Sequence, residues 1–179
     1  CPEVIKTQVE EDHQFLVLSF HPKSTANTIQ WENAGKMLAR MHQTSNDKFG
    51  LDHSNFMGSL VQTNDYADSF VEFFVLQRLL PQVRIARDSG ALNDRHSRHF
   101  ENLFNRLENL IPTEKPAFVH GDSWTGNFHP STEGVYFIDP AIAFSHREVD
   151  LAMTTLFGQV SEAFYRGYEE EFPTEKHLT

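Results

Sequence analysis

"FVHGDSWTGNF" (residues 118–128), followed by "VYFIDPAIAF" (residues 135–144), places two carboxylates and one carboxamide close to apolar runs. Asp122 and Asn127 lie in the first stretch, and Asp139 ends the apolar run of the second. Pro130 and Gly134 bracket a reversal between them, which predicts a β-hairpin. Residues at the open ends of antiparallel arms lie about 5 Å apart. We therefore expect Asn127 and a buried Asp139 to be neighbours, with Asp122 pointing to the same place.

The residue types and their order indicate phosphoryl transfer. Carboxylate and amide oxygens suit Mg²⁺ better than zinc. Phosphoryl transfer needs a carboxylate that accepts the proton of an attacking hydroxyl, and an Asn and an Asp that hold Mg²⁺. The protein-kinase signature separates its catalytic Asp and its Asn by four residues, and a metal-binding Asp follows later. The segments D-SWTG-N and D-P of this chain reproduce that order and spacing.

Simpler interpretations exist for each residue taken alone. Asp122 or Asn127 in a glycine-containing loop can be a turn former that accepts backbone N–H groups. Asp139 can simply end a strand, because the residue before a proline favours β geometry. The ordered triplet with a hairpin between its members favours the catalytic interpretation.

Two other site types fit the same segment less well. His120, Asp122 and His129 could form a zinc hydrolase site, but the alternation of side chains along a strand makes this awkward. "GDSWTGNF" has the glycine spacing of a phosphate-binding loop, yet Asn127 stands where such a loop requires lysine.

Length, charge and cysteine content restrict the function classes. The 179 residues amount to about one domain, and 15 Lys plus Arg against 25 Asp plus Glu give a formal charge of −10. We therefore expect no nucleic-acid partner. No apolar run approaches the ~20 residues of a membrane span, so we expect no membrane partner. Cys1 is the single cysteine, which indicates a reducing, cytoplasmic setting.

Periodicity predicts a mixture of strands and helices. Residues 13–20 are expected to form a buried strand, and residues 27–42 a helix with one apolar face. A long loop covers residues 46–68. Further helices are expected from Asp68 or Ser69 to Gly90, with a kink or split at Pro81, and at residues 92–110, 148–157 and 161–172.

"HGDSWTGN", "IDPAIAFSHREVDLAMTTLFG" and "FYRGYEEEFP" together resemble the fructosamine kinase (ketosamine kinase) family. This family shares its kinase-like fold with aminoglycoside phosphotransferases and choline kinases. The resemblance covers nearly the whole chain from His13 onward. It implies an α+β, protein-kinase-like fold: a mostly helical C-terminal lobe at residues 23–179 with a small β-hairpin at the active site. Residues 1–22 would be the last strands of the N-terminal lobe and the hinge. The rest of that lobe, with its Gly-rich loop and lysine, would precede Cys1.

The resemblance also implies roles for residues of the motif. Asp122 would be the catalytic base, and Asn127 and Asp139 the Mg²⁺ ligands. Trp124 would lie against the sugar part of the substrate, although core packing is its alternative.

Further roles concern nucleotide binding and support of the catalytic loop. Leu18, Ser19 and Phe20 would form the hinge whose backbone meets the adenine of ATP. Asp150 resembles the buried helix carboxylate that steadies the catalytic loop, with a plain salt bridge as the alternative. His120 is expected to orient the same loop by hydrogen bonding.

Some positions depart from the family pattern HGDLWSGN and its downstream motifs. Ser123 replaces Leu, Thr125 replaces Ser, and Ser145 and Gln159 stand where Gly is usual. None of these changes removes a metal-binding or proton-transfer group.

The resemblance implies an ATP- and Mg²⁺-dependent kinase that phosphorylates a sugar hydroxyl of a small-molecule ketosamine, such as a fructosamine or ribulosamine, in deglycation-type repair. One alternative is a related aminoglycoside- or choline-type phosphotransferase. The other is a nucleotide- or metabolite-binding module without catalysis, if the chain truly lacks an N-terminal lobe.

Overall fold

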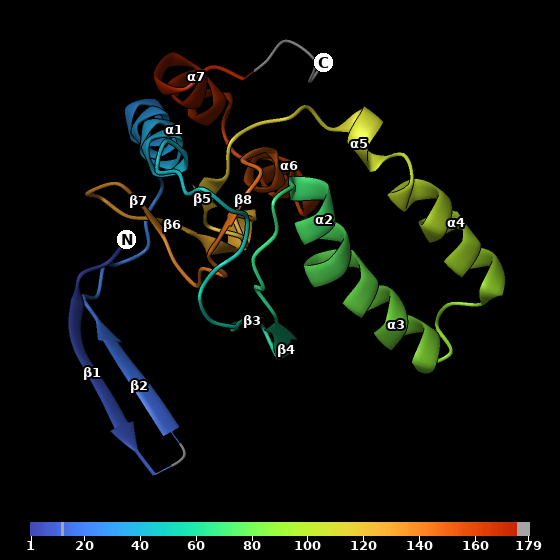
Figure 1. Cartoon of the computed structure of the whole chain (residues 1–179). Helices are drawn as coiled ribbons and strands as arrows, with labels where there is room; N and C mark the ends of the chain where they lie inside the picture. Colours follow the sequence, from blue (N-terminus) through green and yellow to red (C-terminus); the bar gives the residue numbers. More distant parts are fainter. Residues whose placement is uncertain (12, 175–179) are drawn as a thin grey trace. The chain divides into compact units, whose positions relative to one another are not determined.

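The structure is a computed structural model that describes residues 1–11 and 13–174 (Figure 1). Its strands are β1 Val4–Glu10, β2 His13–Leu18, β3 Asn55–Met57, β4 Leu60–Gln62, β5 Ala117–Val119, β6 Phe128–Pro130, β7 Val135–Phe137 and β8 Ala143–Ser145. Its α-helices are α1 Thr28–His42, α2 Phe70–Phe74, α3 Leu80–Asp88, α4 Asp94–Phe104, α5 Leu107–Leu110, α6 Glu148–Leu156 and α7 Glu162–Glu171. The expected α+β class is confirmed. No helix in the described residues has the length and apolar character to cross a membrane.

The chain divides into two compact units. The first unit combines Cys1–Met41, Asp122–Pro140 and the chain from Asp150 onward, and the second combines His42–Gly121 with Ala141–Val149. The three residues of the expected catalytic triplet therefore all belong to the first unit.

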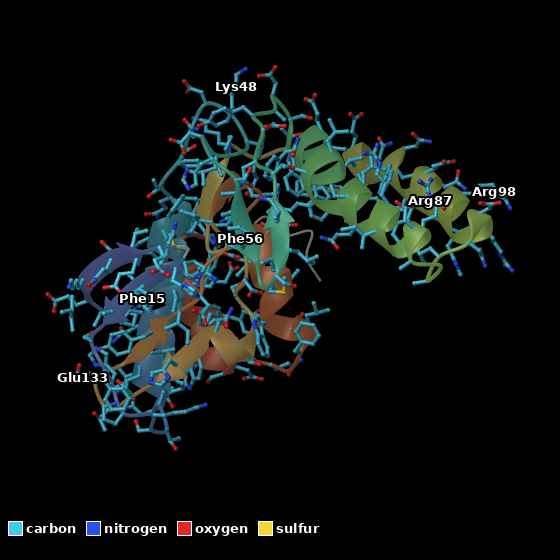
Figure 2. All side chains as sticks on the ribbon, turned by 90° about the horizontal axis from the view of Figure 1, so that it is seen from below. Phe15, Lys48, Phe56, Arg87, Arg98 and Glu133 are labelled. Atoms are coloured by element: carbon cyan, nitrogen blue, oxygen red, sulfur yellow. The ribbon has the colours of Figure 1, made fainter. Side chains whose placement is uncertain are left out.

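The first unit begins with an antiparallel ribbon of β1 and β2, visible in blue in Figure 1. The strand predicted at residues 13–20 is present, but the expectation that it is buried is wrong. Phe15, labelled in Figure 2, is 50% exposed, and Leu16 is 60% exposed. Within the described residues β2 pairs with β1 alone. A two-stranded ribbon without a further layer leaves both of its faces in water.

Helix α1 confirms the helix predicted at residues 27–42. Asn27 caps it reciprocally, because its Oδ1 accepts the N–H of Gln30 at 2.9 Å while Gln30 Oε1 accepts the N–H of Asn27 at 2.9 Å. The helix buries Ala34, Leu38 and Ala39 in a core to which α7 contributes Phe164 and Tyr168. The hairpin adds Phe128, Val135 and Phe137 to the same core.

Two glycines let α1 and α7 cross in close contact, and Figure 1 shows the two helices side by side. A Cβ at Gly35 would lie 1.9 Å from Phe164 O, and one at Gly167 would lie 2.0 Å from Glu32 O. At the rim, Lys36 pairs with Glu170 at 2.9 Å. The hydrogen bond to Glu170 raises the pKa of Lys36 above its usual value.

Gly167→Ala is expected to destabilise the protein by about 1–3 kcal/mol, because the added methyl meets helix backbone that cannot rotate away. Gly134→Ala is the matched control, since nothing lies within 4 Å of a Cβ placed there. Urea unfolding of both variants measures the difference. Equal urea midpoints for the two variants would contradict the close contact between α1 and α7 at Gly167.

The second unit contains the helical segment predicted from residue 68 or 69 to residue 90. Ser69 caps α2 by accepting the N–H of Glu72 at 3.1 Å. A π-helical turn, Val75–Leu79, joins α2 to α3, and Pro81 lies in the first turn of α3. The expected split at Pro81 is thus a local change of helix type. Proline has no N–H to donate to the preceding turn, so the hydrogen-bond pattern shifts there.

The helix predicted at residues 92–110 is present as two pieces. Asn93 caps α4 with its side chain, and His96 Nδ1 accepts the N–H of Asn93 in return at 3.3 Å. Asn105 and Arg106 interrupt the helix before α5, since Arg106 donates its N–H to Leu103 O three residues back. Figure 2 labels Arg98 on α4 and Arg87 on the preceding helix α3.

The antiparallel pair β5–β8 belongs to the second unit. Arg147 lies two residues after β8 and is 3% exposed, and its guanidinium holds Glu114 through contacts of 2.8 to 3.1 Å. Beside it, His146 donates from Nε2 to Pro112 O at 3.0 Å. The loop that precedes β5 is therefore fixed to the end of β8.

Arg78 joins the π-helical turn to the loop after β4. It donates to Thr63 O at 2.8 Å and to the buried Asn64 Oδ1 at 2.5 Å, and its guanidinium lies 4.6 Å from the centre of the Phe73 ring. Burial lowers the pKa of Arg78 to about 10. Carbonyl oxygens and an aromatic face thus compensate a largely buried cation.

Arg78→Ala is expected to destabilise the protein by about 1–3 kcal/mol, because Asn64 Oδ1 loses a charged donor inside the protein. Arg78→Lys should recover only part of this, since an ammonium cannot reproduce the planar fork. Thermal unfolding reports both. Arg87→Ala, at an exposed position whose ion pair is with its neighbour Asp88, serves as the control with little expected change.

Candidate active site

The loop that carries the motif leaves β5 through a position that only glycine fits. Gly121 has φ +79°, and a Cβ there would lie 2.0 Å from Ala141 O. His120 is 2% exposed, and its carbonyl accepts the N–H of Ala141 at 2.8 Å. The chain is thus anchored immediately before Asp122. The supporting role expected for the His120 side chain stays a prediction.

Asp122 and Asn127 are bound directly to each other. Asn127 is 7% exposed, and its Nδ2 donates both to the Asp122 carboxylate Oδ2 and to the Asp122 main-chain oxygen, each at 2.8 Å. Both partners are pure acceptors, so the amide nitrogen must face them. The Oδ1 atom of Asn127 is left to face another ligand. A 3₁₀ turn, Thr125–Asn127, closes the loop and produces this contact.

The predicted hairpin is confirmed as β6–β7, with Phe128 opposite Phe137. Ile138 donates its N–H to Asn127 O at 3.0 Å, which extends the pairing by one step. The expectation that Asp139 stands opposite Asn127 is therefore one residue off, because the register pairs Asn127 with Ile138. Asp139 follows directly, so it still leaves the hairpin beside Asn127.

Asp139 differs from the expectation in a second respect, because its side chain is exposed and not buried. Its backbone has φ +52°, in the left-handed region that residues other than glycine rarely adopt. Its carboxylate makes no hydrogen bond or ion pair with any other described residue. Proline at position 140 disfavours a helical conformation at Asp139, and the strained backbone turns the chain out of the hairpin. Such strain is found at ligand-binding positions.

The donor set fits a hard divalent cation. Asn127 Oδ1 and the Asp139 carboxylate are oxygens, and neither engages another described residue. Among the described residues no group of three or more His, Cys, Asp or Glu could hold a metal. A Mg²⁺ ion is commonly bound through one or two protein oxygens plus water and substrate phosphates, so a two-ligand site fits Mg²⁺ and not zinc.

The predicted zinc alternative finds no support. His129 uses its Nε2 on the carbonyl of His21 at 2.7 Å. It therefore has a structural partner of its own within the first unit.

Asp150 at the start of α6 is fully buried and lies against the loop between β5 and β6. The Ser123 hydroxyl, also fully buried, lies 2.8 Å from Asp150 O and 3.1 Å from Asp150 Oδ1. Ser123, the residue next to Asp122, is thereby connected to α6. The supporting role expected for Asp150 remains a proposal.

Trp124 packs against Gly126 and Phe157. A Cβ at Gly126 would come within 2.2 Å of the Trp124 ring, so the indole packs directly on the glycine backbone. Phe157, at the end of α6, meets the ring edge-on with centroids 5.7 Å apart and is itself 67% exposed. Sequence reasoning missed Phe157, although its place in the "TTLFG" stretch was a signal. Trp124 is half-buried, consistent with either substrate contact or packing.

The residues expected to form the hinge lie at the end of β2, where Leu18 is the last residue of the strand and Ser19 and Phe20 follow it. Ser19 donates its N–H to Glu3 O at 2.9 Å, and its Oγ accepts the N–H of Glu3 at 3.0 Å. Leu18 is half-buried, whereas Phe20 is 87% exposed. The hydrogen bonds to Glu3 hold the backbone at Ser19, while the side chain of Phe20 is in solvent.

Comparison with known proteins identifies the family of the chain. The model of the family described as fructosamine kinase matches residues 1–179, the whole chain. The chain belongs to the fructosamine kinase family. A protein of Lactiplantibacillus plantarum named "Probable ketoamine kinase" is 31% identical over 175 residues, which cover 96% of this chain and 61% of that protein. A "Probable ketoamine kinase" of Synechocystis is 36% identical over 165 residues, or 91% of this chain and 55% of that protein.

Solved structures give the same result. A crystal structure from Thermobifida fusca described as "putative fructosamine-3-kinase" superposes with a TM-score of 0.88 at 32% identity, covering 96% of this chain and 60% of that one. One from Haemophilus somnus with the same description has a TM-score of 0.86 at 27% identity, covering 98% and 59%. The chain thus spans about 60% of the length of these relatives.

Within this fructosamine kinase family member, Ser123 is the departure with a visible structural consequence. The family pattern has Leu there, whose side chain could not donate a hydrogen bond. Here the single hydroxyl proton is shared between a helix carbonyl, Asp150 O, and a buried carboxylate oxygen, Asp150 Oδ1.

Ser123→Ala is expected to lower the free energy of unfolding by about 1–3 kcal/mol, because Asp150 Oδ1 loses a donor in a fully buried place. Thr155→Ala is the control, since its hydroxyl is exposed and bonds within its own helix to Ala152 O. Urea unfolding compares the two variants. A Ser123→Ala protein as stable as the Thr155→Ala control would show that the hydrogen bond contributes nothing.

Proposed function

We propose that this protein transfers the γ-phosphoryl group of Mg-ATP to a sugar hydroxyl of a ketosamine, such as a fructosamine or ribulosamine. Family membership supports the reaction class. The observation that carries the proposal is the Asn127–Asp122 pair, with Asn127 Oδ1 and the Asp139 carboxylate left for a cation beside it.

The proposed role of Asp122 is to orient and deprotonate the acceptor. The acceptor oxygen attacks the γ-phosphorus while its proton passes to the Asp122 carboxylate, and the bond to the bridging β–γ oxygen breaks to release ADP. Asn127 Nδ2 holds one carboxylate oxygen, Oδ2. This hydrogen bond holds the carboxylate in one orientation relative to the loop.

The proposed metal and nucleotide sites use the remaining predicted residues. Asn127 Oδ1 and Asp139 would hold Mg²⁺, which neutralises charge on the transferring phosphoryl group. Leu18, Ser19 and Phe20 would contact the adenine through their backbone, as the hinge between a lobe ending near residue 22 and a lobe at residues 23–179.

The proposed acceptor contact is the aromatic pair of Trp124 and Phe157. An indole that rests on Gly126 is held in one orientation, which suits it to stack against the C–H face of a sugar. Asp150 and His120 would hold the loop between β5 and β6 in place.

Asp122→Asn in the full-length natural protein is expected to lower kcat by about 10²–10⁴, because an amide cannot accept the hydroxyl proton. The fold should persist, since the carboxamide can still present an oxygen to Asn127 Nδ2. ADP release from Mg-ATP, with and without fructosamine or ribulosamine, is the measurement. Asp88→Asn, an exposed site at the end of α3, is the matched control.

Acceptor-dependent ADP release that only Asp122→Asn loses would support the proposal. Turnover unchanged in Asp122→Asn would remove Asp122 from the mechanism. Release that depends on an aminoglycoside or choline, and not on a ketosamine, would replace the proposed acceptor with that of the related phosphotransferases.

A further inference from the structure

A single imidazole binds the segment after β2 to the β6–β7 hairpin. His21 places Nε2 2.9 Å from Ser19 Oγ and Nδ1 3.2 Å from Glu133 Oε2, and its side chain is 17% exposed. Its carbonyl accepts from His129 Nε2 at 2.7 Å. Glu133, labelled in Figure 2, lies in the turn between β6 and β7. The ring therefore contacts both segments at once.

The partners define the tautomer of the neutral ring. A carboxylate only accepts, so Nδ1 must carry the proton that faces Glu133. Ser19 Oγ already accepts the N–H of Glu3 at 3.0 Å, which leaves its O–H available to donate to His21 Nε2. The neutral Nδ1–H tautomer satisfies both contacts together.

An aromatic stack and a second hydrogen bond reinforce the contact. The rings of His21 and Tyr136 stack with centroids 4.1 Å apart and 23° between their planes. Tyr136 donates its hydroxyl to the same Glu133 oxygen at 2.9 Å. This hydrogen bond raises the pKa of Tyr136 above its usual value. Glu133 thus receives donors from both stacked rings.

Backbone contacts continue the connection along the chain. Lys23 forms an isolated antiparallel bridge with Ser131, and Ser24 donates its N–H to Pro130 O at 2.9 Å. Gln30, in the first turn of α1, donates to Thr132 O at 2.9 Å. The turn of the hairpin cannot shift along this segment without breaking several of these bonds.

The hairpin and the segment carry the two ends of the proposed nucleotide site. Asn127 directly precedes β6 and Asp139 closely follows β7, while Ser19 belongs to the proposed adenine contact. A bound nucleotide must reach both ends, so their separation has to match its length. Holding reacting groups at a fixed distance is a recognised contribution to catalysis.

We propose that His21 is a positioning residue that sets the distance between the adenine-contacting segment and the metal-binding hairpin, and thereby the affinity for Mg-ATP. The proposal rests on the proposed function, since it uses the same nucleotide site. A purely structural His21 would change the unfolding temperature without a selective effect on the nucleotide.

The experiment compares His21→Ala with wild type, both as full-length natural protein. The KM for Mg-ATP and its Kd by calorimetry are expected to rise about tenfold, while the KM of the ketosamine stays within about twofold. His53→Ala is the matched control, because His53 also pairs with a carboxylate, Asp52 at 2.5 Å, but is exposed and lies in the other unit. It should leave both KM values unchanged.

A second variant and an NMR measurement test the role of His21 if His21→Ala folds poorly. Glu133→Gln, at an exposed turn, keeps an oxygen for both rings but removes the charge, and a smaller rise in the Kd of Mg-ATP is expected. Nitrogen-15 NMR of the His21 ring should show the Nδ1–H tautomer, and Glu133→Gln should weaken that signature.

Kd and KM values for Mg-ATP within about twofold of wild type in both variants would overturn the proposal. So would a parallel rise in the KM of the ketosamine, since it would indicate general loosening of the fold. Wild type that binds Mg-ATP but phosphorylates no ketosamine refutes the proposed function alone, and weaker Mg-ATP binding by the variants would then still support the role of His21. Wild type that binds no Mg-ATP refutes both.

Discussion

The hydrogen bonds from Asn127 Nδ2 to Asp122 are the contact on which the rest of the site depends. An amide has two donors and one acceptor oxygen, and here both donors are committed to one residue. The remaining oxygen is thereby directed away from Asp122. One contact thus orients the proposed base and a proposed metal ligand together. The short 3₁₀ turn and the β6–β7 hairpin serve to bring these two residues into reach.

Three features around this contact would each lower the stability of the fold if taken alone. Gly121 adopts a conformation that excludes a side chain, and Asp139 adopts a left-handed backbone that its side chain disfavours. Asp150 is a carboxylate with no exposure to water. Each feature would be unfavourable alone, and together they surround the motif. Unfavourable features gathered around one motif are expected where geometry matters more than local stability.

The sequence predicted the local elements well where capping and periodicity act over a few residues. Asn27 and Ser69 set the starts of α1 and α2 through side-chain acceptors that the sequence displays directly. The turn between Pro130 and Gly134 predicted the β6–β7 hairpin, because a turn signal also acts over only a few residues. The break at Asn105 and Arg106 escaped prediction, because the apolar spacing continues across it while the backbone does not.

The sequence by itself determined the motif, the order of its three oxygen-bearing residues, the hairpin between them and the family resemblance. These follow from spacing and residue type, which are one-dimensional properties. The tertiary structure decided that Asn127 faces Ile138 and not Asp139, that Asp139 is exposed, and that β2 has no covering layer in the described chain. It also brought His21 to Glu133 and Ser123 to Asp150. Register, burial and contacts between distant residues depend on how elements pack, and packing is a property of the whole fold that no short segment encodes.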